Sequence, residues 1–168
     1  MISETLQNAI NKQIIREMYS SNLYLSMAAY YASINLNGFA NWMRIQAEEE
    51  MAHALKFFDY VLDRGGNVAL GAIDAPQVKW DNEVAPFEDA YAHEQNVTAW
   101  INELMDLSHS EKDYAAISFL NWFIDEQVEE EKNASEILDR LSLTHSSPAS
   151  LFLLDNELKQ RVFVPPTA

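Results

Sequence analysis

Apolar residues recur at intervals of three and four along most of the chain, which is the spacing of a helix with one buried face. The 168 residues include only four glycines and five prolines, and β-branched residues form no alternating runs, so the pattern predicts an all-α protein. Turn signals divide the pattern into five segments. The helices are expected at residues 3–35, 39–64, 86–109, 113–143 and 148–161.

A few residues set the expected ends of these helices. Ser3 can cap the first helix, and Asn35-Leu36-Asn37-Gly38 is expected to end it, because Asn and Gly accept the left-handed conformation. Pro86 suits the first turn of the third helix, and Ser147-Pro148 suits the start of the fifth. Pro165-Pro166 is expected to end all regular structure.

Residues 67–85 break the helical pattern, and Gly71 and Pro76 lie within them. So long a connection is unusual in a compact domain unless it crosses from one end of a bundle to the other. The sequence therefore predicts a four-helix up-down bundle with one long crossover between the second and third helices. A short fifth helix follows, and residues 1–168 are expected to form a single domain.

Polar residues interrupt the apolar face of each of the four long helices at a similar depth in the bundle. A lone glutamate on such a face more often reaches solvent, and a lone histidine is more often a satisfied core residue. Buried carboxylates need a partner or must take up a proton, and four helices with the same exception indicate a shared metal site. The residues are Glu17, Glu50, His53, Glu94, Gln127 and Glu130.

The ligand types favour iron or manganese, because the set is rich in carboxylates and has one imidazole and no sulfur. Zinc would also bind but carries no redox chemistry. Di-iron bundles use one Glu from each of two helices and Glu-x-x-His from each of the other two. Here Glu50-x-x-His53 is present, whereas Gln127-x-x-Glu130 replaces the second motif. The second metal position would therefore lack an imidazole.

Further acidic residues suggest a second cation site beside the first. Glu126, Glu129 and Glu130 repel one another at helical spacing, and such a run is usually only a solvated face. Glu49, however, could face Glu126 and Glu129 across a helix interface. Tyr24 lies two turns after the first-helix glutamate, and it is either a core aromatic or a hydrogen-bond or electron donor near the metals.

The remaining methionine and histidine candidates are not expected to bind the metal. Met51 could serve as an axial haem ligand at a dimer interface, but a helical methionine is usually a packing residue, and no haem is expected. His93, His109 and His145 are expected at the surface, with His109 well placed at a helix C-terminus.

The charge and composition narrow the class of partner. With 26 acidic and 11 basic residues the formal net charge is −15, which disfavours nucleic acid and anionic membranes and favours cations. The absence of cysteine excludes disulfides and thiolate metal sites. No signal-peptide pattern and no apolar run of about 18 residues is present, so a cytoplasmic protein is expected.

At the motifs of this site the sequence resembles the bacterial non-haem ferritins, and the resemblance extends over nearly the whole chain. The segments that carry it are Arg16-Glu17-Met18-Tyr19-Ser20-Ser21, Ala47-Glu48-Glu49-Glu50-Met51-Ala52-His53, Phe57-Phe58-Asp59-Tyr60, His93-Glu94-Gln95 and Glu126-Gln127-Val128-Glu129-Glu130-Glu131-Lys132. Bacterioferritin would instead have His in place of Glu130, and rubrerythrin would carry a cysteine-rich module.

The resemblance implies iron storage in a shell of 24 subunits, with Fe(II) oxidised by O2 or H2O2 at a di-iron ferroxidase centre. It implies that Glu17, Glu50 and His53 bind the first iron, that Glu50, Glu94 and Glu130 bind the second, with Gln127 nearby, and that Glu49, Glu126, Glu129 and Glu130 bind a third. Two rival interpretations stay open. One is a small-molecule di-iron oxidase or peroxidase, and the other is a metal-free acidic helical interaction protein.

Overall fold

The computed structural model describes residues 1–144 and 147–165, and within them it contains helices and no strand. The all-α prediction is therefore confirmed. The helices are α1 (Glu4–Ser33), α2 (Asn37–Asp63), α3 (Ala85–Glu111), α4 (Tyr114–Leu143) and α5 (Pro148–Leu158).

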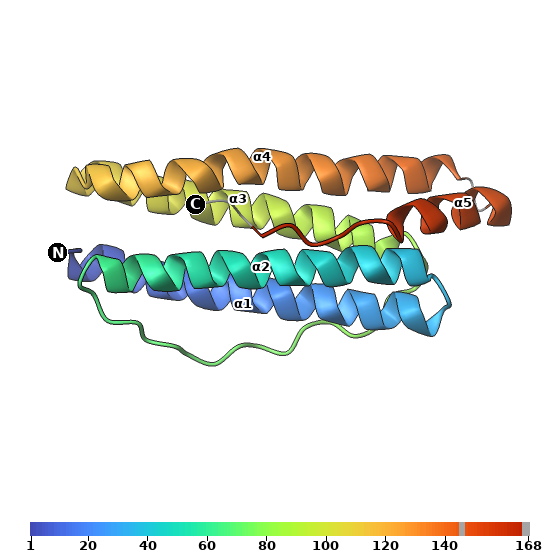
Figure 1. Ribbon diagram of the computed structural model, residues 1–168, viewed down its shortest axis with the longest axis horizontal. Helices are drawn as coiled ribbons and strands as arrows, with labels where there is room; N and C mark the ends of the chain where they lie inside the picture. Colours follow the sequence, from blue (N-terminus) through green and yellow to red (C-terminus); the bar gives the residue numbers. More distant parts are fainter. Residues whose placement is uncertain (145–146, 166–168) are drawn as a thin grey trace.

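Four long helices form a bundle, and the short α5 lies against one end of it (Figure 1). α1 and α2 form one antiparallel pair, and α3 and α4 form the other. The connection between α2 and α3 runs the whole length of the bundle, as the sequence predicts, so α2 and α3 point in the same direction (Figure 1). This topology lets all four long helices contribute side chains to one level of the core.

The crossover is fastened along α1 by side-chain hydrogen bonds. The Asn11 amide donates to the carbonyl oxygen of Asn67 (3.0 Å) and accepts from the backbone N–H of Ala69 (3.3 Å). Near the other end, the Tyr31 hydroxyl donates to the carbonyl oxygen of Glu83 (2.7 Å). These bonds satisfy backbone groups that no regular structure pairs, so the long connection has a defined path.

The start of α1 agrees with the sequence prediction, whereas one of the residues expected to end it has a different role. The Ser3 hydroxyl accepts from the backbone N–H of Leu6 (3.0 Å), as expected of a cap. Asn35 takes the left-handed conformation (φ 63°), whereas Gly38 lies within α2. Glycine is needed at position 38 for a different reason: a Cβ there would lie 1.6 Å from the carbonyl oxygen of Asp155 in α5.

The turn between α3 and α4 is shorter than predicted. α3 continues to Glu111, and Lys112 alone takes the left-handed conformation (φ 57°). Asp113 then caps α4 by accepting from the backbone N–H of Ala116 (3.0 Å). Its second oxygen pairs with Arg64 at 2.8 Å, which ties the end of α2 to the start of α4.

α5 ends at Leu158 rather than at residue 161. Beyond Leu158 the backbone is hydrogen-bonded to a side chain of α2. The Asn41 amide donates to the carbonyl oxygens of Leu158 (3.3 Å) and Arg161 (3.0 Å). Pro165 is not helical, whereas Pro166 and His145 lie outside the described residues. That residues 1–168 form a single domain stays a prediction, which the contacts between α5 and α2 support.

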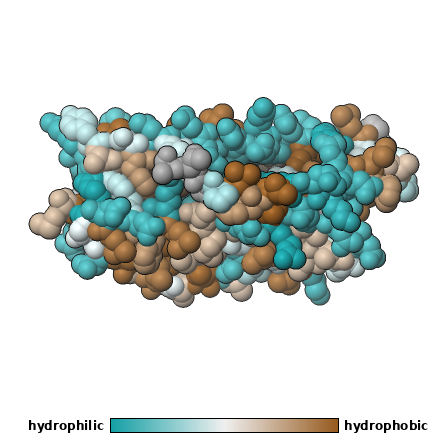
Figure 2. Space-filling view, in the orientation of Figure 1, coloured by the Kyte–Doolittle hydropathy of each residue, from teal (hydrophilic) through white to brown (hydrophobic). Residues whose placement is uncertain are grey.

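The core consists of two hydrophobic clusters. In one of them Tyr31 and Phe39 stack with their ring centroids 5.2 Å apart, and in the other Phe57 and Phe123 stack at 4.0 Å. Within the described part of the chain, no helix combines the length and apolar character needed to cross a membrane. One face of the molecule is largely hydrophilic, with hydrophobic residues gathered along the crossover and over the segment that follows α5 (Figure 2).

Candidate metal centre

The polar residues that interrupt the four helix faces are all buried in the structure. Their exposed fractions are 4% or less. One comes from α1, two from α2, one from α3 and two from α4, so all four long helices contribute, as the sequence predicts. The residues are Glu17, Glu50, His53, Glu94, Gln127 and Glu130.

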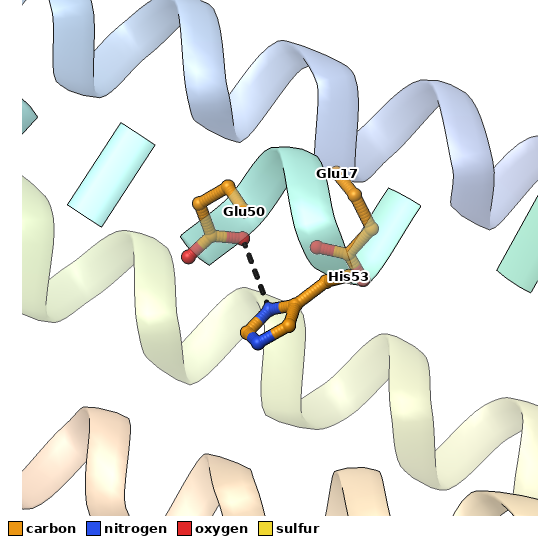
Figure 3. Close-up of side chains that lie close together, drawn as sticks. All are labelled: Glu17, Glu50 and His53. Atoms are coloured by element: carbon orange, nitrogen blue, oxygen red, sulfur yellow. Dashed lines mark ion pairs between the residues drawn. The ribbon is translucent and has the colours of Figure 1, made fainter. Parts of the chain in front are cut away.

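Glu17, Glu50 and His53 converge closely enough to share one ion (Figure 3). One ligand atom from each lies within 4.8 Å of the other two, and Oε2 of Glu50 is 3.6 Å from Nδ1 of His53. Among the described residues, no group donates a hydrogen bond to Oε2 of Glu17 or Oε2 of Glu50, although both atoms are buried. Buried polar atoms are normally paired, and a cation is the missing partner that suits a carboxylate and imidazole set.

Two glutamines that were not predicted from the sequence hold the carboxylates. Gln13 donates to Oε1 of Glu17 at 2.7 Å. Gln46 donates to Oε2 of Glu130 at 2.6 Å and to Oε1 of Glu50 at 3.4 Å. Both glutamines are fully buried. Each stands four residues before a glutamate on the same helix face, and this spacing could have identified them.

Glu94 is held by two other side chains. The Tyr24 hydroxyl donates to its Oε1, and Nε2 of Gln127 lies 3.2 Å from its Oε2. Glu94 joins neither group of close ligand atoms found in the described part of the chain. Tyr24 is fully buried, so it is a core aromatic and a hydrogen-bond donor at the same time.

A second group of ligand atoms adjoins the first. His53, Glu126 and Glu130 also bring ligand atoms within 4.8 Å of one another, and Nε2 of His53 is 3.9 Å from Oε1 of Glu126. Glu49, Glu126 and Glu129 line a cavity of about 280 Å³ here. Glu49 therefore approaches the acidic run of α4, as expected, and His53 lines the same cavity.

Burial and mutual repulsion raise the pKa values of the central carboxylates. Burial raises the pKa of Glu17 well above its usual range, and the charge of Glu50 raises it further. Burial likewise raises the pKa of Glu50 and of Glu130 well above their usual range, and repulsion from Glu94 adds to both. The pKa of Glu94 is raised by burial, although its bond from Tyr24 opposes the shift. These shifts favour the protonated forms of the carboxyl groups in the metal-free cluster, so a bound cation would compete with protons there.

The expectation that His93 lies at the surface is wrong. Its exposed fraction is 8%, and Nε2 lies 2.7 Å from the Ser20 hydroxyl. Burial lowers the pKa of His93 to about 4, so the ring is neutral at physiological pH. His93 lies next to Glu94 on the buried face of α3. The rings of Tyr19 and Trp100 pack near its imidazole and shield it from solvent.

Two other side chains lie outside the core. His109 is exposed near the end of α3, as predicted. Met51 is 38% exposed, so it does not lie in the core of this chain.

Comparison with known proteins identifies relatives over almost the whole chain. Residues 7–144 match the model of the ferritin-like domain family. A bacterial non-heme ferritin of Bacteroides fragilis is 44% identical over 161 residues, which cover 96% of this chain and 100% of the relative. A bacterial non-heme ferritin of Staphylococcus saprophyticus is 41% identical over 163 residues, covering 97% of this chain and 98% of the relative.

Solved structures show the same similarity. An engineered closed form of the Archaeoglobus fulgidus ferritin superimposes with a TM-score of 0.96 at 49% identity and covers 98% of this chain and 100% of that chain. The open-pore ferritin of Archaeoglobus fulgidus superimposes with a TM-score of 0.95 at 49% identity, covering 96% of this chain and 100% of that chain. The bundle and its crossover are thus shared over nearly their full length.

Proposed function

The chain belongs to the ferritin family, and we propose that it stores and detoxifies iron by oxidising Fe(II) inside the bundle and releasing Fe(III) for deposition as a mineral. Iron is then the substrate and cargo of the protein. The relatives at 41–44% identity are bacterial non-heme ferritins, which favours storage over the rival small-molecule oxidase.

One observation carries the assignment of the centre. Oε2 of Glu17 and Oε2 of Glu50 are buried without a hydrogen-bond partner among the described residues, and an imidazole nitrogen of His53 lies beside them. We assign the first Fe(II) to these three residues. The second Fe(II) is assigned to Glu50, Glu94 and Glu130, so that Glu50 bridges the two ions.

The chain's own groups prepare the site for a change in charge. Oxidation raises the positive charge of each ion by one, and carboxylates in a water-excluded site stabilise that change strongly. Gln46 holds Glu130, while Tyr24 and Gln127 hold Glu94, so these carboxylates are oriented before iron arrives. Two Fe(II) supply two electrons, which with two protons reduce one O2 to H2O2, or one H2O2 to two waters.

The acidic cavity next to the centre supports a third iron position. Glu49, Glu126 and Glu129 line it, and Glu130 belongs to both the centre and the adjoining group of ligand atoms. We propose that iron bound there exchanges with the di-iron centre. Assembly into a 24-subunit shell and a cytoplasmic location stay predictions, which the full-length similarity to ferritins supports.

The function is tested by adding Fe(II) aerobically to metal-free protein and following Fe(III) absorbance as the iron-to-subunit ratio is raised. We expect a fast phase that saturates at about two or three irons per subunit, followed by slow mineral growth. Glu50→Ala should abolish the fast phase. Glu48→Ala, two positions away on the exposed face of α2, is the matched control and should leave it intact. A fast phase that survives in Glu50→Ala would refute the bridging role, and oxidation without later mineral growth would favour the rival oxidase.

A further inference from the structure

The segment after α5 turns back along the bundle (Figure 1). Val164 and Pro165 of this segment line the cavity beside the metal centre, together with His53. The backbone of the segment is anchored by Asn41 of α2, which donates to the carbonyl oxygens of Leu158, Lys159 and Arg161. This anchor places the Arg161 side chain over the next turns of α2, beside the proposed iron ligands.

Arg161 occupies a built site there. Its guanidinium pairs with Oε2 of Glu49, donates to Oε1 of Gln46 (2.9 Å) and to the carbonyl oxygen of Trp42 (3.3 Å), and lies 4.4 Å from the centroid of the Trp42 ring. The paired side chains of Arg161 and Glu49 are 20% and 19% exposed. A largely buried pair with several charge-assisted bonds is held more firmly than an exposed one.

The contact with Gln46 determines which way its amide points. Arg161 can only donate, so the carbonyl oxygen of Gln46 must face it. The NH2 group of Gln46 is thereby directed to Glu130 and Glu50. Arg161 therefore orients a bridging glutamine that holds two of the proposed iron ligands.

The contact with Glu49 affects the acidic cavity. Glu49, Glu126 and Glu129 are its acidic lining, and Val164 and Pro165 of the same C-terminal segment close one side. The guanidinium neutralises one of the three carboxylates and engages one of its oxygens. A divalent ion that uses Glu49 must therefore compete with Arg161.

We propose that the Arg161 guanidinium occupies the third iron position in the metal-free protein, and that a divalent metal ion displaces it from Glu49. The displacement also breaks the bond from Arg161 to Gln46. Gln46 is then less firmly oriented and binds Glu130 less tightly. The C-terminal segment then couples occupancy of the outer position to the ligand geometry of the di-iron centre. This inference rests on the proposed function, because it takes the assignment of both positions from it.

Zn(II) binding to the full-length metal-free protein tests the proposal without any redox turnover. Isothermal titration calorimetry should resolve two tight sites and one weaker site per subunit in the wild type. In Arg161→Gln we expect the weaker site to bind about tenfold more tightly, which is ~1.4 kcal/mol. The weaker of the two tight sites should lose about threefold in affinity, since Gln46 is no longer fixed.

Matched variants separate the contact from the charge. Lys159→Gln removes a positive charge from the same segment and should leave the isotherm unchanged, whereas Arg161→Lys keeps the charge and should retain most of the competition. Circular dichroism would verify that each variant is folded. If the third site is equally weak in Arg161→Gln, the competition is refuted. If both tight sites of Arg161→Gln bind Zn(II) with wild-type affinity, the link through Gln46 is refuted. If the wild type has no tight Zn(II) sites, the proposed function itself is refuted.

Arginine modification gives a second measurement. Phenylglyoxal reacts with accessible guanidinium groups, and peptide mass spectrometry reads the modification at each arginine. We expect Zn(II) beyond two ions per subunit to speed modification of Arg161 while the exposed Arg44 reacts at a constant rate. An unchanged Arg161 rate at saturating Zn(II) would overturn displacement.

Discussion

Replacing Glu50 by glutamine should stabilise the metal-free protein while weakening its hold on metal. Ligand oxygens of Glu17 and Glu50 lie within 4.8 Å of each other, where two unit charges repel by about 3.5 kcal/mol at an effective dielectric of about 20. Protonation relieves part of this repulsion, so we expect a gain of about 1–3 kcal/mol. For a chain of this size that corresponds to roughly 3–10 °C in the melting temperature.

The gain should depend on pH in a defined direction. Burial raises the pKa of Glu50 well above its usual range, whereas the unfolded chain has a value of about 4.3. A carboxyl group with a raised folded pKa contributes stability below the unfolded pKa and loses it as pH rises toward the folded value, by about 1.4 kcal/mol per pH unit. Because Glu50→Gln lacks this loss, its advantage over the wild type should widen as the pH rises above the unfolded pKa of about 4.3.

The assay is thermal unfolding followed by circular dichroism in chelator at several pH values, and then with Zn(II) added. Zn(II) should raise the melting temperature of the wild type by mass action and that of Glu50→Gln much less. Glu48→Gln makes the same charge change on the exposed face of α2 and should behave as the wild type. A Glu50→Gln protein that melts below the wild type in chelator at pH 7 would refute the electrostatic argument.

Three further substitutions test separate parts of the structure. Tyr24→Phe removes a hydroxyl that orients a proposed ligand and should slow the fast phase of Fe(II) oxidation about 3- to 10-fold in stopped-flow absorbance. Gln46→Leu leaves Oε2 of Glu130 without its donor, so the weaker tight Zn(II) site should lose about tenfold in affinity by calorimetry. Gly38→Ala places a Cβ 1.6 Å from a backbone carbonyl of α5 and should lower the free energy of unfolding by about 2–4 kcal/mol in urea denaturation. Normal behaviour of any of these variants would contradict the corresponding contact.

The sequence predicts the helices and their buried faces well because each long helix has one core-facing side. In α4 the buried set includes Gln127 and Glu130, the two polar residues that the sequence predicts on its core-facing side. The helical spacing identifies the buried positions whether an apolar or a polar residue occupies them. A polar residue at a buried position can therefore be recognised in the sequence. The level of the carboxylates in the bundle can therefore be predicted from the spacing of residues alone.

Features that depend on contacts between distant segments could not be predicted in the same way. Gly38 looks like a helix terminator, yet its role depends on the approach of α5 more than a hundred residues later. His93 lies beside the buried stripe of its helix, and rings from α1 complete its burial. Arg161 meets Glu49 where the chain turns back after α5, a turn to which Asn41 is hydrogen-bonded from α2. No local sequence pattern encodes that turn.

The position of the centre between two hydrophobic clusters links its affinity to the stability of the bundle. One cluster contains Phe39 and the other Phe57, and both lie on α2, on either side of Glu50 and His53. Burying each large apolar side chain stabilises the fold by about 1.5–3 kcal/mol, so the clusters outweigh a carboxylate penalty of a few kcal/mol. They also exclude water, which keeps the carboxylates desolvated and the penalty in place. A bound cation removes that penalty. The carboxylate repulsion that lowers the stability of the metal-free protein therefore strengthens its binding of metal.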